Sequence, residues 1–169
     1  MIVLDTNVLS ELMRQQPAEA VLCWADQLSP QEVAITAMNE AEILHGIARL
    51  PDSRRKQQLE QGWHALLTTV LQRQVLPFDS DAAHWFAALV RHREGMARPI
   101  STADAVIAAT ALAHDGHLAT RNTADFEAIG LPLINPWSRS GRVHLNPATA
   151  QVPLALRTPD GDLPQLCQS

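Results

Sequence analysis

The sequence predicts an α/β fold, a three-layer α/β/α sandwich with a mostly parallel central sheet. Short apolar runs of strand length alternate along the chain with stretches of helical periodicity. Strands that alternate with helices form βαβ units, whose helices cover both faces of a parallel sheet. The chain has 169 residues, 46% of them hydrophobic, which is enough to bury one core without disulfides.

Five short apolar runs are the predicted strands. The first, Ile2–Leu4, ends at Asp5, and the second is Val33–Thr36. The other three are residues 75–78, 118–120 and 131–134. Each has the length of a strand, and most of the intervals between them show the spacing of helices.

Helices are expected in these intervals. Proline is tolerated at the first helical position, so Pro17 is expected to open a helix through Leu28. Either Asp79 or Ser80 is expected to cap another helix. The remaining predicted helices are residues 37–49, residues 53–72, interrupted only by Gly62, and residues 102–114, closed by Gly116.

The composition changes after residue 137. Residues 138–169 show little apolar periodicity and contain Pro147, Pro153, Pro159 and Pro164. We therefore predict two parts, a domain of residues 1–137 and a proline-rich C-terminal tail of residues 138–169.

Charge and cysteine usage limit the classes of partner and compartment. The formal net charge is −5 and Lys56 is the only lysine, which argues against a broad cationic surface for nucleic acid. A nuclease is still allowed, because bound cations reverse the field of clustered carboxylates. Cys23 and Cys167 lack metal-ligand spacing and suit a reducing compartment, with Cys23 expected in the core. The start of the chain is not a signal peptide and no apolar run approaches about 20 residues, so we expect a soluble cytoplasmic protein without membrane contact.

Three acidic residues stand out by their position. Asp5 directly follows the first strand, where a helix cap is the simpler interpretation. Glu42 lies among apolar residues of a helix, where an exposed position is the simpler interpretation. Glu42 and His45 also form a Glu-x-x-His pair, but di-iron bundles use two copies and one is present. Asp104 opens a helix that is apolar on nearly every face, and it could instead form a capping box with Ser101.

Two further polar residues, Asn122 and Asp125, follow the fourth predicted strand, and they could simply build a turn. In parallel sheets, however, sites form beyond the carboxyl ends of the strands, so all these side chains are expected at one edge. Carboxylates repel one another, and their convergence indicates cations between them. Oxygen ligands without a His or Cys set favour Mg²⁺ or Mn²⁺ over Zn²⁺.

The polar residues form motifs in a definite order. These are Asp5-Thr6-Asn7, Glu42 with Gly46, Asp104 before an alanine-rich stretch, Thr120-Arg121-Asn122 with Asp125-Phe126, and Asn135-Pro136-Trp137. Together they resemble the PIN domain, and their spacing is most similar to the VapC and FitB-like toxins. The resemblance covers Met1 to about Trp137. The tail and His45 depart from the family's pattern.

The resemblance implies a metal-dependent site. Asp5, Glu42 and Asp104 would be acidic metal ligands. Asp125 is the favoured fourth ligand, with Asn122 as a polar neighbour or as the ligand in its place. Thr6 and Asn7 would orient the site.

The function that the resemblance implies is an endoribonuclease, the toxin of a type II toxin–antitoxin pair. Mg²⁺, with Mn²⁺ as a substitute, would activate water to hydrolyse RNA, leaving 5′-phosphate and 3′-hydroxyl ends. A cognate antitoxin protein and a second copy of the chain, in a homodimer, are the implied partners. Candidate contacts to RNA phosphates are Arg14, Arg49, Arg98 and Arg121, each of which is equally well explained as a surface arginine.

Other readings of the motifs fit less well. A haloacid-dehalogenase-type phosphotransferase needs a second aspartate two residues after the first, and Asn7 stands there. A receiver domain needs a lysine after a late strand, and Lys56 lies in a predicted mid-chain helix. A catalytically silent PIN-like scaffold that binds a partner protein remains open as the alternative function.

Truncation after Trp137 is expected to leave both the core fold and catalysis in place, because residues 138–169 carry no periodic apolar face. Urea unfolding of the full and truncated chains measures the fold, and RNA cleavage by both chains measures catalysis. Loss of the folded state on truncation would instead indicate that Leu154, Leu156 and Leu163 pack onto the domain or a dimer partner.

Overall fold

The computed structural model describes residues 1–138 and contains a five-stranded sheet in the order β3-β2-β1-β4-β5. Every neighbouring pair of strands is parallel, so the predicted parallel sheet is confirmed. The first strand of the chain lies at its centre. The strands are β1 (Ile2–Leu4), β2 (Val33–Thr36), β3 (Val75–Leu76), β4 (His117–Ala119) and β5 (Leu133–Ile134).

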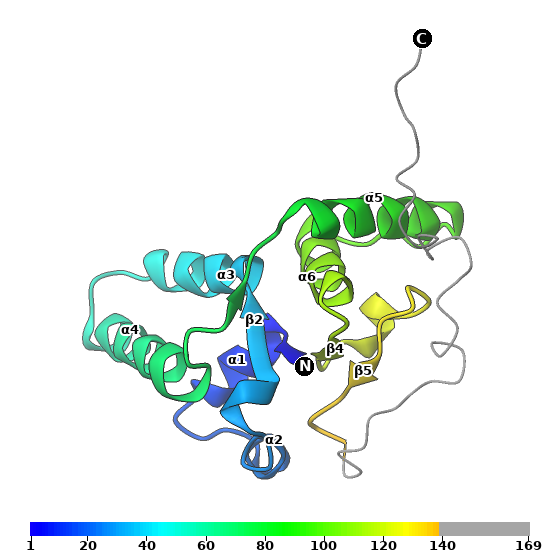
Figure 1. Ribbon diagram of the computed structural model, residues 1–169. Helices are drawn as coiled ribbons and strands as arrows, with labels where there is room; N and C mark the ends of the chain where they lie inside the picture. Colours follow the sequence, from blue (N-terminus) through cyan, green and yellow to red (C-terminus); the bar gives the residue numbers. More distant parts are fainter. Residues whose placement is uncertain (139–169) are drawn as a thin grey trace.

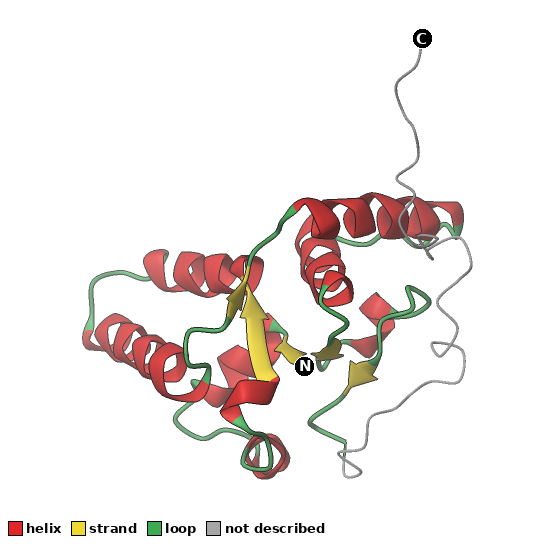
Figure 2. Cartoon of the chain, viewed as in Figure 1, coloured by secondary structure: helices red, strands yellow, loops and turns green. Residues whose placement is uncertain are grey.

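Helices connect the strands and lie on both sides of the sheet (Figures 1 and 2). Within residues 1–138 they are α1 (Thr6–Leu12), α2 (Glu19–Ala25), α3 (Ala37–Ala48), α4 (Arg54–Ala65), α5 (Ser80–Gly95) and α6 (Thr102–Ala113). Two short 3-10 turns, η1 (Pro30–Glu32) and η3 (Thr123–Phe126), and a π-helical turn, η2 (Leu66–Val70), complete the path.

Alternating side chains of the strands enter two separate cores, because successive residues of a strand point to opposite faces. Val3 and Leu118 belong to a core with apolar residues of α5 and α6. Leu4 and Ala119, one residue later in each strand, belong to a core with residues of α1, α2, α3 and α4. The sheet is therefore the middle layer of the predicted three-layer sandwich.

Several predicted boundaries shift for local reasons. The structure begins α2 at Glu19 rather than at Pro17, with extended backbone at Ala18. The long helix predicted for residues 53–72 divides into α4 and η2, and Gln72 and Arg73 end it with positive φ angles. Helix α1 is an element whose bounds we did not predict.

Two of the predicted strands are shorter in the structure than in the sequence prediction. The strand predicted at 75–78 stops at Leu76, because Pro77 has no amide hydrogen to donate to a ladder. Phe78 is exposed and its ring meets that of Phe86 edge-on. Pro132 likewise precedes β5, which begins at Leu133 rather than at residue 131.

Three remaining points concern the cysteine, the tail and the length of the helices. Cys23 is exposed, so the prediction of a core thiol is wrong. Apart from Ser138, the predicted tail lies outside the described residues. Of the helices in residues 1–138, none has the length and apolar character needed to cross a membrane.

Gly116 joins α6 to β4 at a point with no room for a side chain. A Cβ there would lie 3.1 Å from the Ala111 carbonyl oxygen and 3.3 Å from the Val3 side chain. Gly116→Ala is expected to lower the free energy of unfolding by about 1–3 kcal/mol.

Gly62, in the middle of α4, is the matched control, because a Cβ there would meet nothing within 4 Å. Gly62→Ala should raise the free energy of unfolding by about 0.5–1 kcal/mol, since glycine is a poor helix former. Urea unfolding of both variants is the measurement. Equal effects at the two positions would contradict the packing argument.

Candidate active site

Polar residues gather where β1, β2 and β4 end, at the carboxyl edge of the sheet. They surround a cavity of about 530 Å³. The elements that contribute to its wall are α1, α3, α6 and the loop after β4. The lining residues are Asp5, Thr6, Asn7, Ser10, Glu11, Arg14, Glu42, Asp104, Arg121 and Asn122.

Asp5 is one of two buried members of this set, with only 5% of its surface exposed. Its Oδ1 accepts a hydrogen bond of 2.7 Å from the Thr6 amide and thereby caps α1. Its Oδ2 accepts bonds of 2.6 Å from the Asn7 side-chain amide and from the Thr120 hydroxyl. The capping and site interpretations of Asp5 are thus compatible, because one oxygen caps α1 and the other accepts hydrogen bonds from a residue of α1 and from the end of β4.

The electrostatic environment of Asp5 is unfavourable to its charge. Burial raises the pKa of this carboxyl, and the hydrogen bonds from Thr120 and Thr6 oppose that effect without cancelling it. The negative charges of Asp104 and Glu42 raise the pKa further. Asp5 is therefore close enough to both Asp104 and Glu42 to be repelled by each, and a cation beside Asp5 would be stabilised.

Glu42 is held by a chain of hydrogen bonds that begins inside the protein. The buried Asn39 side chain donates to the Thr6 hydroxyl at 3.0 Å, and this hydroxyl donates to Glu42 Oε2 at 2.5 Å. Asn39 is itself held by Thr36, whose amide and hydroxyl both donate to Asn39 Oδ1. Thr36 and Asn39 form the capping box that starts α3. The hydrogen bonds at the start of this helix therefore fix the orientation of the Glu42 carboxylate through Thr6.

Asp104 lies in the first turn of α6 and is half-buried. The Ser101 hydroxyl accepts from the Asp104 amide at 3.1 Å and donates to Asp104 Oδ2 at 2.6 Å. Ser101 therefore caps the helix, and the Asp104 carboxylate remains on the cavity wall.

The two candidates for the fourth position separate in the structure. Asn122 lines the cavity, and its amide donates to the Thr120 hydroxyl at 3.0 Å. Asp125 lies in η3, is exposed and is not part of the cavity wall. The structure thus brings Asn122, and not the favoured Asp125, together with the other site residues.

The four candidate arginines also separate. Arg14 and Arg121 line the cavity, whereas Arg49 and Arg98 do not. Arg14 pairs with Glu11 at 2.9 Å, and the Arg121 guanidinium lies 5.3 Å from the centre of the Trp137 ring. Arg98 instead pairs with Glu127 at 3.5 Å.

Sequence reasoning left three site residues unassigned. Thr120 is fully buried and its hydroxyl donates a hydrogen bond to Asp5. The sequence motif contains Thr120, but no role in the site was predicted for it. Asn39 carried a signal, since it follows Thr36 at capping-box spacing. Glu11 is buried, and hydrogen bonds from the Ala18 amide and then from Arg14 lower its pKa. Glu11 therefore holds the Arg14 guanidinium in place through their ion pair.

The donor set of the cavity suits a hard divalent cation, because its potential ligands are carboxylate and amide oxygens. Among residues 1–138, no group of three or more His, Cys, Asp or Glu side chains is arranged, as they stand, to hold a metal ion. The charges of Glu42 and Asp104 are unfavourable to that of Asp5, and each of these two carboxylates accepts a hydrogen bond from a neutral hydroxyl.

Comparisons with known proteins agree with this arrangement. A family model described as the PIN domain matches residues 2–131. The chain is 42% identical to the VapC ribonuclease Y4jK of Sinorhizobium fredii over 81% of this chain and 98% of that protein. It is 36% identical to the toxin FitB of Neisseria gonorrhoeae over 81% of this chain and 99% of that protein.

Solved structures give the same result. The structure of FitAB bound to an IR36 DNA fragment superposes with a TM-score of 0.76 and 36% identity, covering 82% of this chain and 96% of that chain. Other structures with this fold include a member of the VapBC family of toxin–antitoxin systems from Mycobacterium tuberculosis.

Thr6→Val is expected to lower the free energy of unfolding by about 1–3 kcal/mol, because it leaves the buried Asn39 side chain without an acceptor. Thr6→Ser keeps the hydroxyl and is the control. Urea unfolding without added metal compares the two variants. A Val variant as stable as the Ser variant would show that the hydrogen-bond chain does not hold the site together.

Proposed function

The chain belongs to the PIN-domain family, and from this premise we propose that it is a Mg²⁺-dependent endoribonuclease and the toxin of a type II toxin–antitoxin pair. The observation that carries the proposal is the gathering of Asp5, Glu42 and Asp104 on one cavity wall. The similarity to a VapC ribonuclease over nearly its whole length supports the same reaction class.

Asp5, Glu42 and Asp104 would hold Mg²⁺, with Mn²⁺ as a substitute, and Asn122 supplies a further oxygen at the cavity. The bound ion would supply activation of water for in-line attack on phosphorus and neutralisation of the leaving oxygen. The proposal requires the three carboxylates to close on the ion, because they are spread apart without it. No side chain is needed as a nucleophile.

The other residues of the cavity prepare this site. Thr120 and Asn7 hold the Asp5 carboxylate at the end of the central strand. Arg14 and Arg121 are the positive groups of the cavity wall, and they would contact the phosphates of an RNA strand. Because the chain has a net charge of −5 and a single lysine, attraction of the substrate would be concentrated at this cavity rather than spread over the surface.

The proposed partners follow from the relatives. Solved structures of the same fold include toxin–antitoxin systems, so we propose a cognate antitoxin for this chain. A homodimer and a cytoplasmic location are proposed on the family resemblance alone.

Cleavage of a cellular RNA pool with Mg²⁺ or Mn²⁺ is expected to give discrete fragments with 5′-phosphates, and both EDTA and Asp104→Asn should abolish them. Asp125→Asn is the matched control. It removes one exposed carboxylate outside the cavity and should leave cleavage nearly unchanged. Mapping of fragment ends and calorimetric titration with Mn²⁺ provide two independent measurements.

Metal-independent cleavage that leaves 2′,3′-cyclic phosphates would contradict the proposal, because that chemistry uses the RNA's own hydroxyl as nucleophile. Mn²⁺ affinity that is the same in wild type and Asp104→Asn would contradict the ligand assignment. A protein that binds a partner but cleaves no RNA under any metal condition would favour the silent scaffold instead.

A further inference from the structure

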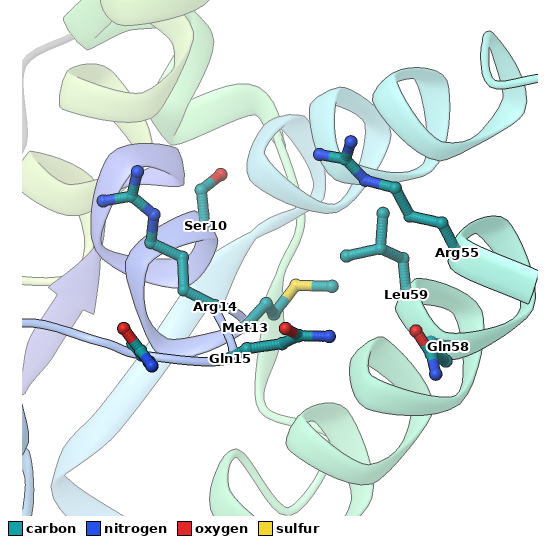
Figure 3. Close-up of a pocket in the computed structure, with 8 residues that line it drawn as sticks. Ser10, Met13, Arg14, Gln15, Arg55, Gln58 and Leu59 are labelled. Atoms are coloured by element: carbon teal, nitrogen blue, oxygen red, sulfur yellow. The ribbon is translucent and has the colours of Figure 1, made fainter.

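A groove outside the acidic cavity runs between the end of α1 and α4. Its volume is about 1200 Å³. Figure 3 shows Arg14 on one wall and Arg55 on the other, with Met13 and Leu59 between them. The remaining lining residues are Ser10, Gln15, Gln16 and Gln58.

This groove is continuous with the acidic cavity through shared residues. Ser10 and Arg14 line both the groove and the cavity that contains Asp5. A third, smaller hollow of about 190 Å³ is also lined by Ser10 and shares Glu42 with the cavity and Leu59 with the groove. The three spaces therefore adjoin one another between the carboxylates and α4.

The charge of the groove is opposite to that of the protein. The chain has a net charge of −5, yet the groove is lined by two arginines and by no acidic residue. Arg55 is exposed and has no carboxylate within ion-pair distance among residues 1–138. Arg14 is anchored by the buried Glu11, with 64% of its side chain still exposed. Two cations on opposite walls, one of them held in place by Glu11, suit a polyanionic strand.

The smaller hollow has the character of a base pocket. Its walls are mainly apolar, with Ile43, Ile47 and Leu59 among them, and it opens beside Glu42. A Cβ added at Gly46, also on its wall, would meet nothing within 4 Å. Entry of an unstacked base of single-stranded RNA would remove its flat apolar face and these apolar walls from water together.

We propose that the groove between α1 and α4 carries one flank of a single RNA strand, with Arg14 and Arg55 contacting its phosphates and one base entering the hollow at Gly46. The inference rests on the proposed nuclease function. The glutamines of the groove supply donors and acceptors for sugars and base edges. Arg55 is thereby a substrate contact remote from the reacting phosphate.

The test measures binding separately from cleavage. Fluorescein-labelled single-stranded RNA of random sequence is titrated into the Asp104→Asn protein at several salt concentrations, with fluorescence anisotropy as the readout. Adding Arg55→Ala should weaken binding severalfold and reduce the salt slope of the affinity by about one. Arg91→Ala, an exposed arginine on α5 across the molecule from α4 (Figure 1), removes the same charge and should have neither effect.

A second pair of variants tests the base pocket, which is the hollow at Gly46. Gly46→Leu fills the hollow. It should weaken RNA binding in the Asp104→Asn protein and change the positions of cleavage when Asp104 is intact, whereas Gly95→Leu, at an equally open glycine of α5, should do neither. Equal binding by the Arg55 and Arg91 variants would overturn the inference and leave the groove to a protein segment. Undetectable RNA binding would overturn it as well.

Comparison with cleavage identifies which claim fails. RNA cleavage that does not depend on Arg55 would contradict the proposed path of the RNA strand but not the proposed nuclease activity. RNA binding that depends on Arg55, without any cleavage, would contradict the proposed nuclease activity but not the proposed path of the RNA strand.

Discussion

The whole site depends on one buried carboxylate at the end of the central strand. Asp5 receives hydrogen bonds from its own helix and from the end of β4, and these bonds keep a charged group where burial and two like charges oppose it. Each donor comes from an element that the fold places at the same sheet edge. The five-stranded order, with β1 between β2 and β4, is what makes this convergence geometrically possible.

Local sequence signals predicted the parts of the fold that local physics decides. The bounds of β1 and β2 and the start of α3 agree with the prediction, because short apolar runs and a capping box define them. The division of the long helix after Ala65 was missed, since the one glycine of the segment, Gly62, lies inside α4 and no proline marks the break. The end of β3 and the start of β5 depend on Pro77 and Pro132, which have no amide hydrogen to donate to a neighbouring strand.

The sequence singled out most acids of the cavity but not the buried hydroxyl that binds one of them. Acids after strand ends carry a signal, because an unpaired buried charge is costly. Thr120 and Arg55 carry none, because a buried threonine and a surface arginine are both common in proteins. Asn122 and Asp125 both follow β4, and only the turn into η3 decides that Asn122 lines the cavity. Such choices rest on tertiary geometry, which spacing along a chain does not contain.

The hydrogen-bond chain from Thr36 to Glu42 has a single polarity. A backbone amide cannot reverse its dipole, so the Thr36 amide forces Asn39 to present its oxygen inward and its nitrogen outward. Thr6 must then accept from that nitrogen, and its one proton is left to point at the carboxylate. In other surroundings a threonine hydroxyl rotates freely. Here the Thr6 hydroxyl has one orientation, because the direction of each hydrogen bond in the chain is set by the bond before it, starting from the backbone amide of Thr36.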